Sequence, residues 1–143
     1  MTGDVASLVI APFQPENQSQ VKNLILAGLG EHWGFVDHSK NPDLDDIATT
    51  YSNATFLVAW LDGKIVGTGA FITPSKSVAQ VVRMSVARDL RRCGIGRKIL
   101  AQLCERARGA GYRRMMLETT DTWDDVIRFY VKFGFRITHY DNG

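Results

Sequence analysis

The feature that most constrains the fold is a short basic turn, Arg91-Arg92-Cys93-Gly94-Ile95-Gly96, which follows an apolar run at 81–86. After the turn, apolar residues recur at helical spacing, which predicts a helix from Gly96 to about Arg108. The N-terminus of a helix leaves several main-chain N–H groups without partners and carries a partial positive charge. Because glycines also let the backbone approach a bulky anion, a strand, turn and helix of this kind are typical of a phosphate-binding site.

Basic residues gather around this turn, although the chain as a whole is nearly neutral. The formal net charge of +2 favours neither nucleic acid nor an anionic membrane as a partner. The basic residues around the turn are Arg83, Arg88, Arg91, Arg92, Arg97 and Lys98. A solvated helix face would account for any single one of them, whereas an anion site would account for the cluster.

The length and composition predict one globular domain, residues 1–143, with a substantial core. The two cysteines, Cys93 and Cys104, show no metal-ligand spacing and are too few for a disulfide framework, which predicts no metal site and a reducing, cytoplasmic setting. Residues 1–8 show no signal-peptide pattern, and no apolar stretch reaches transmembrane length. No association with a membrane is therefore expected.

The apolar patterns predict a mixed, mostly antiparallel sheet with helices on both faces. The expected elements, in order, are a strand at 8–10, a helix at 16–29, a helix beginning at Asn41-Pro42, strands at 55–61, 64–72 and 78–87, a helix at 96–108, a strand at 114–118, a helix at 123–133 and a closing strand at 135–140. Asp62-Gly63 predicts a tight hairpin. Gly67 and Gly69 weaken the prediction of the strand that follows it.

Three phosphate-binding motifs compete for the turn. A nucleotide-hydrolysing loop needs four residues between its glycines, followed by Lys and Ser or Thr, and the turn lacks both features. A dinucleotide fingerprint needs a third glycine and a parallel unit, whereas this turn follows an antiparallel meander. The third motif, Arg/Gln-x-x-Gly-x-Gly/Ala, is matched completely by Arg91, Gly94 and Gly96. A protein that binds a different phosphate ligand stays an alternative.

A second feature, Ile127-Arg128-Phe129-Tyr130-Val131-Lys132-Phe133-Gly134-Phe135, follows about thirty-five residues later. Together the two stretches resemble the Gcn5-related N-acetyltransferase (GNAT) superfamily, whose members transfer an acetyl group from acetyl-CoA to an amine. The resemblance covers most of the chain, and its specific anchors are Met84-Ser85-Val86, the turn, Phe129-Tyr130 and Gly134-Phe135. It implies the acyl-CoA N-acyltransferase fold, with acetyl-CoA as cosubstrate.

The resemblance also implies how acetyl-CoA would be held. The strand at 81–86 would splay from its neighbour, and the exposed backbone of Met84 and Val86 would pair with the pantetheine arm as an extra strand does. Main-chain amides from Arg92 to Arg97 would bind the pyrophosphate, so the side chain of Cys93 is expected to be dispensable. The implied cosubstrate-binding residues are Met84, Ser85, Val86, Arg91, Arg92, Cys93, Gly94, Ile95, Gly96, Arg97 and Tyr130.

Tyr130 matches the tyrosine that, in many family members, protonates the departing thiolate. A neutral amine attacks the thioester carbonyl, an oxyanion forms and a thiolate leaves. A tyrosine hydroxyl has a pKa of about 10, so it keeps a proton to donate at neutral pH, while the N–H of Val86 would stabilise the oxyanion. Alternatively, Tyr130 only packs between helix and sheet.

Members often carry an asparagine seven residues earlier, where this chain has Trp123, which cannot supply an amide contact.

The general base is not identified by the resemblance. Some members carry a glutamate in the strand before the turn, but Gln80-Val81-Val82-Arg83 contains no carboxylate. Glu118, acting directly or through a water, is one candidate, and Glu31, His32 and Asp37 are others. An unperturbed histidine has a suitable pKa of about 6.5, although a lone loop histidine is more often ordinary surface. Loss of the proton to a water chain is a further alternative.

The acceptor would bind at the first two helices and their connection, because this region usually sets specificity in the family. Here it is acidic and aromatic, which would suit a cationic amine. Alternatively, its aspartates Asp43, Asp45 and Asp46 simply favour a helix N-terminus. The candidate substrate-binding residues are Glu31, His32 and Trp33.

The expected function is therefore acetyl-CoA-dependent N-acetylation of a primary amine, on a small molecule or a protein, by direct attack on the thioester. The alternative is a non-catalytic acyl-CoA-binding or sensing domain.

The family generally has one more strand after the closing one, but the sequence stops at the turn pattern Asp141-Asn142-Gly143. Three explanations stay open: the sequence is cut short before that strand, a partner chain supplies the strand, or the sheet keeps an open gap. An unpaired edge favours strand addition, so a monomer or homodimer is expected.

Overall fold

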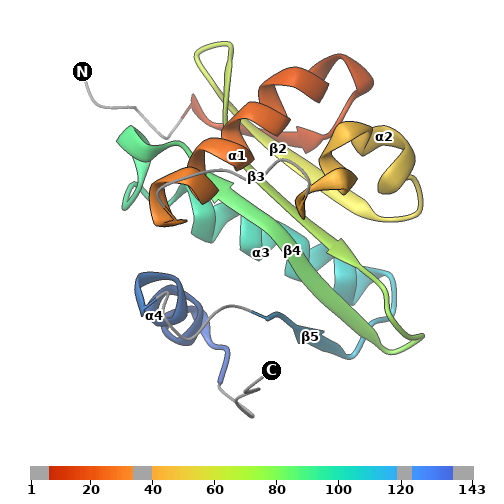
Figure 1. Ribbon diagram of the computed structural model, residues 1–143. Coiled ribbons are helices and arrows are strands. Elements are labelled where there is room, and N and C mark those ends of the chain that lie inside the picture. The colour runs from red at the N-terminus through yellow and green to blue at the C-terminus, as the bar shows by residue number, and fades with distance from the viewer. Residues whose placement is uncertain (1–6, 34–39, 119–123, 137–143) are drawn as a thin grey trace.

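The protein is described by a computed structural model over residues 7–33, 40–118 and 124–136 (Figure 1). The strands are β1 (Val9–Pro12), β2 (Thr55–Leu61), β3 (Lys64–Ile72), β4 (Val78–Val86) and β5 (Arg114–Met116). The helices are α1 (Gln18–Trp33), α2 (Ile47–Thr50), α3 (Ile95–Gly109) and α4 (Asp124–Phe133). The five strands form one sheet in the order β1-β2-β3-β4-β5, antiparallel except for the parallel pair β4–β5. The predicted mixed, mostly antiparallel sheet is confirmed.

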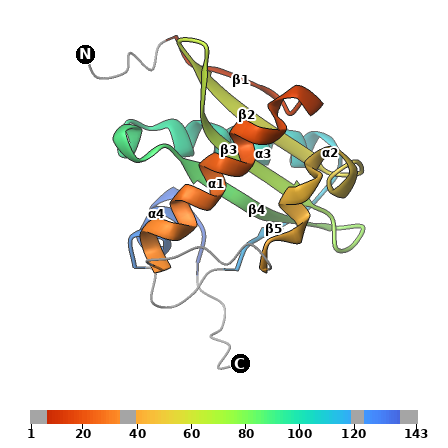
Figure 2. The same cartoon turned by 45° about the horizontal axis from the view of Figure 1, so that its top comes forward.

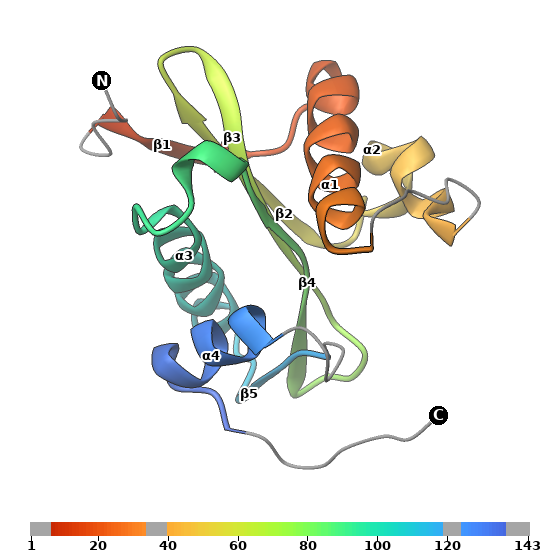
Figure 3. The same ribbon diagram turned by 60° about the vertical axis from the view of Figure 1, so that its left-hand side comes forward.

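Helices cover both faces of the sheet, as predicted: α1 and α2 lie on one side, and α3 and α4 lie on the other (Figure 3). Alternation along β2 supplies both interfaces, because successive side chains of a strand point to opposite faces. Leu57 and Ala59 belong to the buried cluster under α3, and Phe56 and Val58 belong to the cluster under α1. Figure 2 shows α1 lying across the sheet with α2 beside it.

Glycines in β3 allow α3 to pack close to the sheet. A Cβ atom at Gly69 would lie 2.5 Å from Cγ2 of Ile99 and 2.6 Å from Sδ of Met84. At Gly67 it would lie 2.8 Å from Cδ1 of Ile99. Cβ atoms do not tolerate such contacts, so the two glycines that weaken the strand pattern are the ones that the packing of α3 requires.

Replacing Gly69 with alanine is therefore expected to destabilise the fold by about 1–3 kcal/mol, the usual range for overpacking a core. Urea denaturation measures the effect as a lower midpoint at an unchanged slope. Gly109→Ala is the matched control, since a Cβ at this position of α3 meets nothing within 4 Å. Equal midpoints for the two variants would refute the role given to Gly69.

Helix α1 differs from its prediction at both ends. A 3-10 turn at Pro15–Asn17 precedes it, so the α-helix begins at Gln18 rather than at residue 16. It also continues through two glycines to Trp33 instead of ending at residue 29. A glycine inside a helix costs only about 1 kcal/mol relative to alanine. Gly28 also brings the helix close to β4, where a Cβ would lie 3.2 Å from Oγ of Ser85.

A helical segment begins at Asn41-Pro42 as predicted, with Asn41 in the N-cap position, but it is a 3-10 turn rather than an α-helix. Pro42–Asp45 forms a 3-10 turn, and α2 is a single short segment capped by Asp46, whose Oδ1 accepts from the N–H of Thr49 at 3.3 Å. The side chain of Asn41 makes no cap, because its Oδ1 accepts a hydrogen bond from Nη2 of Arg83 at 3.1 Å. The side chain of Asn41 therefore binds Arg83, a residue distant in sequence, instead of a main-chain N–H of its own helix.

The remaining predictions concern the strand ends and the C-terminal part. β1 is placed one residue later than the predicted 8–10 and ends at Pro12, and β5 is shorter than the predicted 114–118. Phe135 and Arg136 are not in a strand, and the rest of the predicted closing strand lies outside the described residues. Among the described helices, none is long and apolar enough to cross a membrane.

Candidate active site

β4 and β5 separate partway along β4. They pair only from Val78 with Arg114 to Gln80 with Met116, whereas β4 continues to Val86. Residues 81–86 thus have no strand on their β5 side within the described part of the chain (Figure 1). This is the divergence that the family resemblance implied.

The free edge of β4 presents the main-chain groups of alternate residues. The N–H of Ala87 donates to the carbonyl of Val66 in β3 at 2.8 Å. Because main-chain groups alternate in direction along a strand, those of Val86 and Met84 point away from β3. Consistent with this, the carbonyl of Val86 accepts from Nε of Arg91 at 3.2 Å. The N–H of Val86 is left directed to the open side.

The basic turn, residues 91–96, presents a row of unpaired amides at the start of α3. Gly94 is the N-cap with φ 86°, and Arg92 also takes a left-handed conformation with φ 66°. The first bond of the helix runs from the N–H of Lys98 to the carbonyl of Gly94 at 3.1 Å. No described residue accepts a hydrogen bond from the amides of residues 92–97. Successive free donors at a helix N-terminus form an anion site.

The arginine side chains of the turn have different neighbours. Arg91 pairs with Glu31, with Nη1 and Oε2 2.5 Å apart, and so ties the turn to the last part of α1. The guanidinium of Arg97 lies over the ring of Phe133 in α4, 5.3 Å from its centre, where a cation is attracted to the aromatic face. Arg92 is exposed. The amides therefore offer a more fixed anion site than these side chains do.

Arg83 does not join this basic cluster, contrary to the prediction. It pairs with Asp43 on the α1 and α2 face, with Nη2 and Oδ1 2.6 Å apart. Burial alone would lower the pKa of Arg83, but its hydrogen bond to Asp43 and the charge of that carboxylate raise the pKa above its ordinary value. The same pairing, with a hydrogen bond from Tyr51, outweighs burial and lowers the pKa of Asp43.

The aspartates that made the predicted acceptor region acidic are paired with other groups of the protein. Besides Asp43, Asp45 pairs with Lys22 at 2.7 Å, and Asp46 caps α2. The alternative interpretation, aspartates that favour a helix N-terminus, also fits their positions, because Asp43 and Asp45 lie in the first turn of the 3-10 helix and Asp46 caps α2. The three carboxylates thus have partners and do not form an open anionic pocket.

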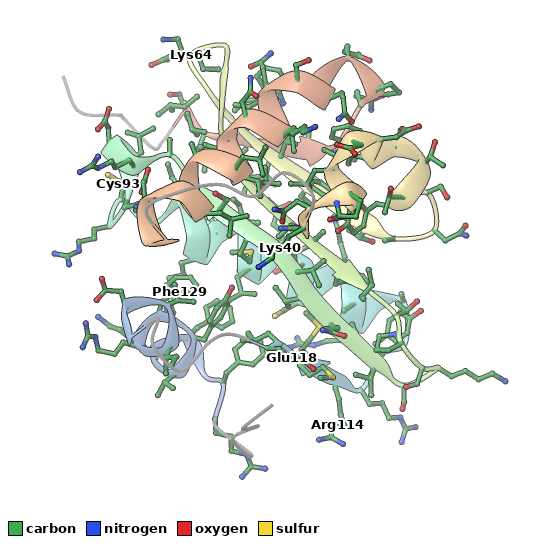
Figure 4. The ribbon with its side chains drawn as sticks, in the orientation of Figure 1. Lys40, Lys64, Cys93, Arg114, Glu118 and Phe129 are labelled. Atoms are coloured by element: carbon green, nitrogen blue, oxygen red, sulfur yellow. The ribbon has the colours of Figure 1, made fainter. Side chains whose placement is uncertain are left out.

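Of the three predicted substrate-binding residues, only Glu31 is placed. Its pairing with Arg91 brings it to the basic turn, so it is not a free carboxylate for an amine. The side chains of His32 and Trp33 lie outside the described part of the structure, as does Asp37. Figure 4 labels Lys40, the first described residue after that gap. Sequence patterns alone gave no signal for the pairing of Glu31 with Arg91.

Tyr130 is buried in the core cluster between the sheet and α3, and only 8% of it is exposed. Its ring makes edge contacts with Phe129 and Phe135, at centroid distances of 5.1 and 5.8 Å. Burial raises the pKa of its hydroxyl to about 12. The hydroxyl has no hydrogen-bond partner within the described residues. Tyr130 thus packs in the core, as the alternative interpretation held, and also holds an uncommitted proton.

The turn, the open strand and α4 meet at one point. A Cβ at Gly96 would lie 3.4 Å from Cζ of Phe129 and 3.6 Å from Cγ2 of Val86. Figure 4 shows Cys93 at the turn, Phe129 on α4 and Glu118 beyond the end of β5. Glu118 is exposed. Trp123 lies outside the described residues.

The described residues of the candidate site form no recognisable metal centre. Within the described ranges, no three His, Cys, Asp or Glu side chains gather as metal ligands would. The donors that the described residues supply there are main-chain amides, a tyrosine hydroxyl and arginines, a set that suits a phosphorylated organic ligand.

Comparison with known proteins identifies the family. The sequence model of the Acetyltransferase (GNAT) family matches residues 22–135. The chain belongs to the GNAT acetyltransferase family. A protein of Xenopus tropicalis named probable N-acetyltransferase camello is 35% identical over 111 residues, which cover 74% of this chain and 51% of that protein. The chain thus spans about half the length of this curated relative.

Solved structures share the fold. A GNAT-family acetyltransferase from Staphylococcus aureus Mu50 has a TM-score of 0.84 at 24% identity, covering 91% of this chain and 85% of its own. The PaiA N-acetyltransferase of Thermoplasma acidophilum, solved in complex with coenzyme A, has a TM-score of 0.83 at 16% identity, covering 95% and 94%. The predicted acyl-CoA N-acyltransferase fold is confirmed.

Proposed function

We propose that residues 1–143 act as a single acetyl-CoA-dependent N-acetyltransferase domain, which acetylates a primary amine of a small molecule or a protein. The observation that carries the proposal is the row of unpaired amides at residues 92–97, beside the free edge of β4. The amides would donate to the pyrophosphate of CoA, and Met84 and Val86 would pair with the pantetheine arm. Membership of the GNAT family and the CoA complex of PaiA support this ligand.

The residues would divide the chemistry as follows. The amine nitrogen bonds to the thioester carbon, and the N–H of Val86 donates to the carbonyl oxygen as negative charge develops there. The carbon–sulfur bond then breaks, and the hydroxyl of Tyr130 gives its proton to the departing sulfur. Glu118 takes the proton that the amine loses, directly or through a water, and solvent returns a proton to Tyr130. Among the placed carboxylate candidates, Glu118 is preferred because Glu31 is paired with Arg91.

A mass-spectrometric screen of amines and peptides with acetyl-CoA tests the proposal, together with calorimetry against CoA, NAD and ATP. Acetylated product and binding of CoA are the expected results. Binding of CoA without product across a broad panel would favour the non-catalytic acyl-CoA-binding domain. Binding of ATP with CoA ignored would refute both. The monomeric or homodimeric state and the cytoplasmic location stay predictions.

Replacing Cys93 with serine is expected to leave the affinity for acetyl-CoA and the turnover within about twofold of the wild type. The reason is that the main-chain N–H of residue 93, rather than its side chain, is the proposed donor, and this group is kept in the variant. Calorimetry and steady-state kinetics measure the two quantities. A loss of affinity of tenfold or more would show that the thiol itself takes part.

A further inference from the structure

β4 contains one extra residue at Arg83. Thr68 and Ala70 in β3, two positions apart, lie opposite Ser85 and Val82, three positions apart, so the register shifts there. Arg83 takes a left-handed conformation with φ 54°. This is a β-bulge, and a conformation of this kind costs a non-glycine residue free energy unless its surroundings hold it.

The bulge reverses the alternation of β4. Before it, Val81 faces α3 and Val82 faces α1, as expected for neighbours in a strand. After it, Met84 and Val86 pack against the α3 cluster, although an uninterrupted strand would place even-numbered residues on the α1 face. Main-chain groups alternate together with side chains. The bulge at Arg83 therefore decides which amides and carbonyls face the open edge.

From the β3 side, a buried threonine holds the bulge. The hydroxyl of Thr68 donates to the carbonyl of Arg83 at 2.8 Å. Thr68 is fully buried, with 0% exposure, so a variant without the hydroxyl would leave that carbonyl without this partner.

From the other side, the segment before α2 holds the side chain of Arg83. Asp43 accepts from Nε at 2.9 Å and from Nη2 at 2.6 Å, a side-on, two-point contact that fixes the orientation of the guanidinium. Asn41 accepts from Nη2 at 3.1 Å, and the hydroxyl of Tyr51 donates to Asp43 at 2.6 Å. Burial and the bond to Asp43 raise the pKa of Tyr51 to about 12, so its proton stays in this network at neutral pH.

We infer that Thr68 and Asp43 are positioning residues for the cosubstrate, an inference that rests on the proposed function. By holding Arg83 in the bulge from its carbonyl and its guanidinium, they fix the main-chain groups that face the open edge. These groups, on Met84 and Val86, are the ones that would pair with the pantetheine arm. The amides of residues 92–97 lie beyond the end of β4, so the pyrophosphate site is expected to depend on the bulge much less than the open edge does.

Two ligands separate these sites in a binding test. CoA would use both the open edge of β4 and the amides of residues 92–97, whereas 3′-phosphoadenosine 5′-diphosphate, the nucleotide half of CoA, would use only the amides. Calorimetry of Thr68→Val is expected to show at least fivefold weaker binding of CoA, with the nucleotide half within twofold of the wild type. Thr68→Ser keeps the hydroxyl and is expected to bind both as the wild type does. Equal loss for both ligands, or no loss for either, would overturn the inference.

Asp43→Asn is expected to repeat the selective loss, since the amide lacks the charge and one of the two acceptor oxygens. Asp45→Asn is the matched control, because Asp45 pairs with Lys22 and its side chain is 65% exposed. Thermal melting shows whether each variant is folded at the assay temperature.

Amide hydrogen exchange of the free protein provides a readout that does not need CoA. Loss of the bulge would weaken the bond from Ala87 to Val66, so exchange at Ala87 is expected to be at least tenfold faster in Thr68→Val and Asp43→Asn, relative to amides of β2. Unchanged exchange would overturn the inference. If the wild type binds no CoA, the proposed function fails, while the exchange rates still decide whether Thr68 and Asp43 hold the bulge.

Discussion

Replacing Tyr130 with phenylalanine is expected to lower kcat for amine acetylation about 100-fold, within the range typical of losing a general acid. The affinity for acetyl-CoA is expected to stay within about twofold. Phenylalanine fills the same space among Phe129 and Phe135, and the hydroxyl has no partner within the described residues whose loss would disturb the core. The variant therefore removes the proton donor and little else. Steady-state kinetics and calorimetry measure the two quantities.

Tyr112→Phe is the matched control, since Tyr112 is another partly buried tyrosine, in edge contact with Phe71 at a centroid distance of 6.2 Å. This variant is expected to keep the kcat and the affinity for acetyl-CoA of the wild type. If kcat of the Tyr130→Phe variant were unchanged, Tyr130 would not be the general acid.

The pH dependence of kcat provides a further check on this role. Because burial raises the pKa of Tyr130 to about 12, its acid form persists up to about pH 11, and kcat should not fall near pH 10 through ionisation of this residue.

Replacing Gly94 with aspartate is expected to weaken binding of acetyl-CoA by about 10- to 100-fold. The new carboxylate would stand at the N-cap of α3, among the amides proposed for the pyrophosphate, and like charges a few ångströms apart near a protein surface repel by roughly 1–4 kcal/mol. The backbone there is left-handed with φ 86°, a conformation that aspartate and asparagine tolerate better than other residues, and a Cβ meets nothing within 4 Å.

Gly94→Asn separates charge from shape, because asparagine has nearly the same size and the same tolerance of that backbone. It is expected to bind acetyl-CoA several-fold more tightly than the aspartate variant, and the difference should shrink at high salt, which screens exposed charges. Equal affinities for the two variants at low salt would place the pyrophosphate elsewhere.

Elements whose signal is local were predictable from the sequence. Asp62 and Gly63 both take positive φ, 52° and 80°, which a two-residue hairpin loop requires and which few residue pairs adopt easily. Likewise, Gly94 is the left-handed N-cap of α3, at the place where the turn motif calls for a glycine. In both cases the residue type itself restricts the backbone.

Element ends set by packing were not predictable. By residue type alone, Gly28 predicts the end of a helix. In the structure it lies inside α1 and brings that helix close to Ser85 in β4. Asn41 is a good cap by type, but its side chain binds Arg83 instead. Gly69 weakens a strand pattern, while in the fold it makes room for Ile99. Each local preference is small, about 1 kcal/mol, and a close tertiary contact outweighs it.

The sequence by itself predicted a row of free main-chain amides, because the spacing of Arg91, Gly94 and Gly96 before a helix indicates one without information on the rest of the chain. Only the tertiary structure decided which charged side chains form ion pairs within the protein. It pairs Arg83 with Asp43, forty positions away, and Arg91 with Glu31. Periodicity records which face of an element a residue lies on, but the partner of a charge depends on how elements distant in sequence pack together.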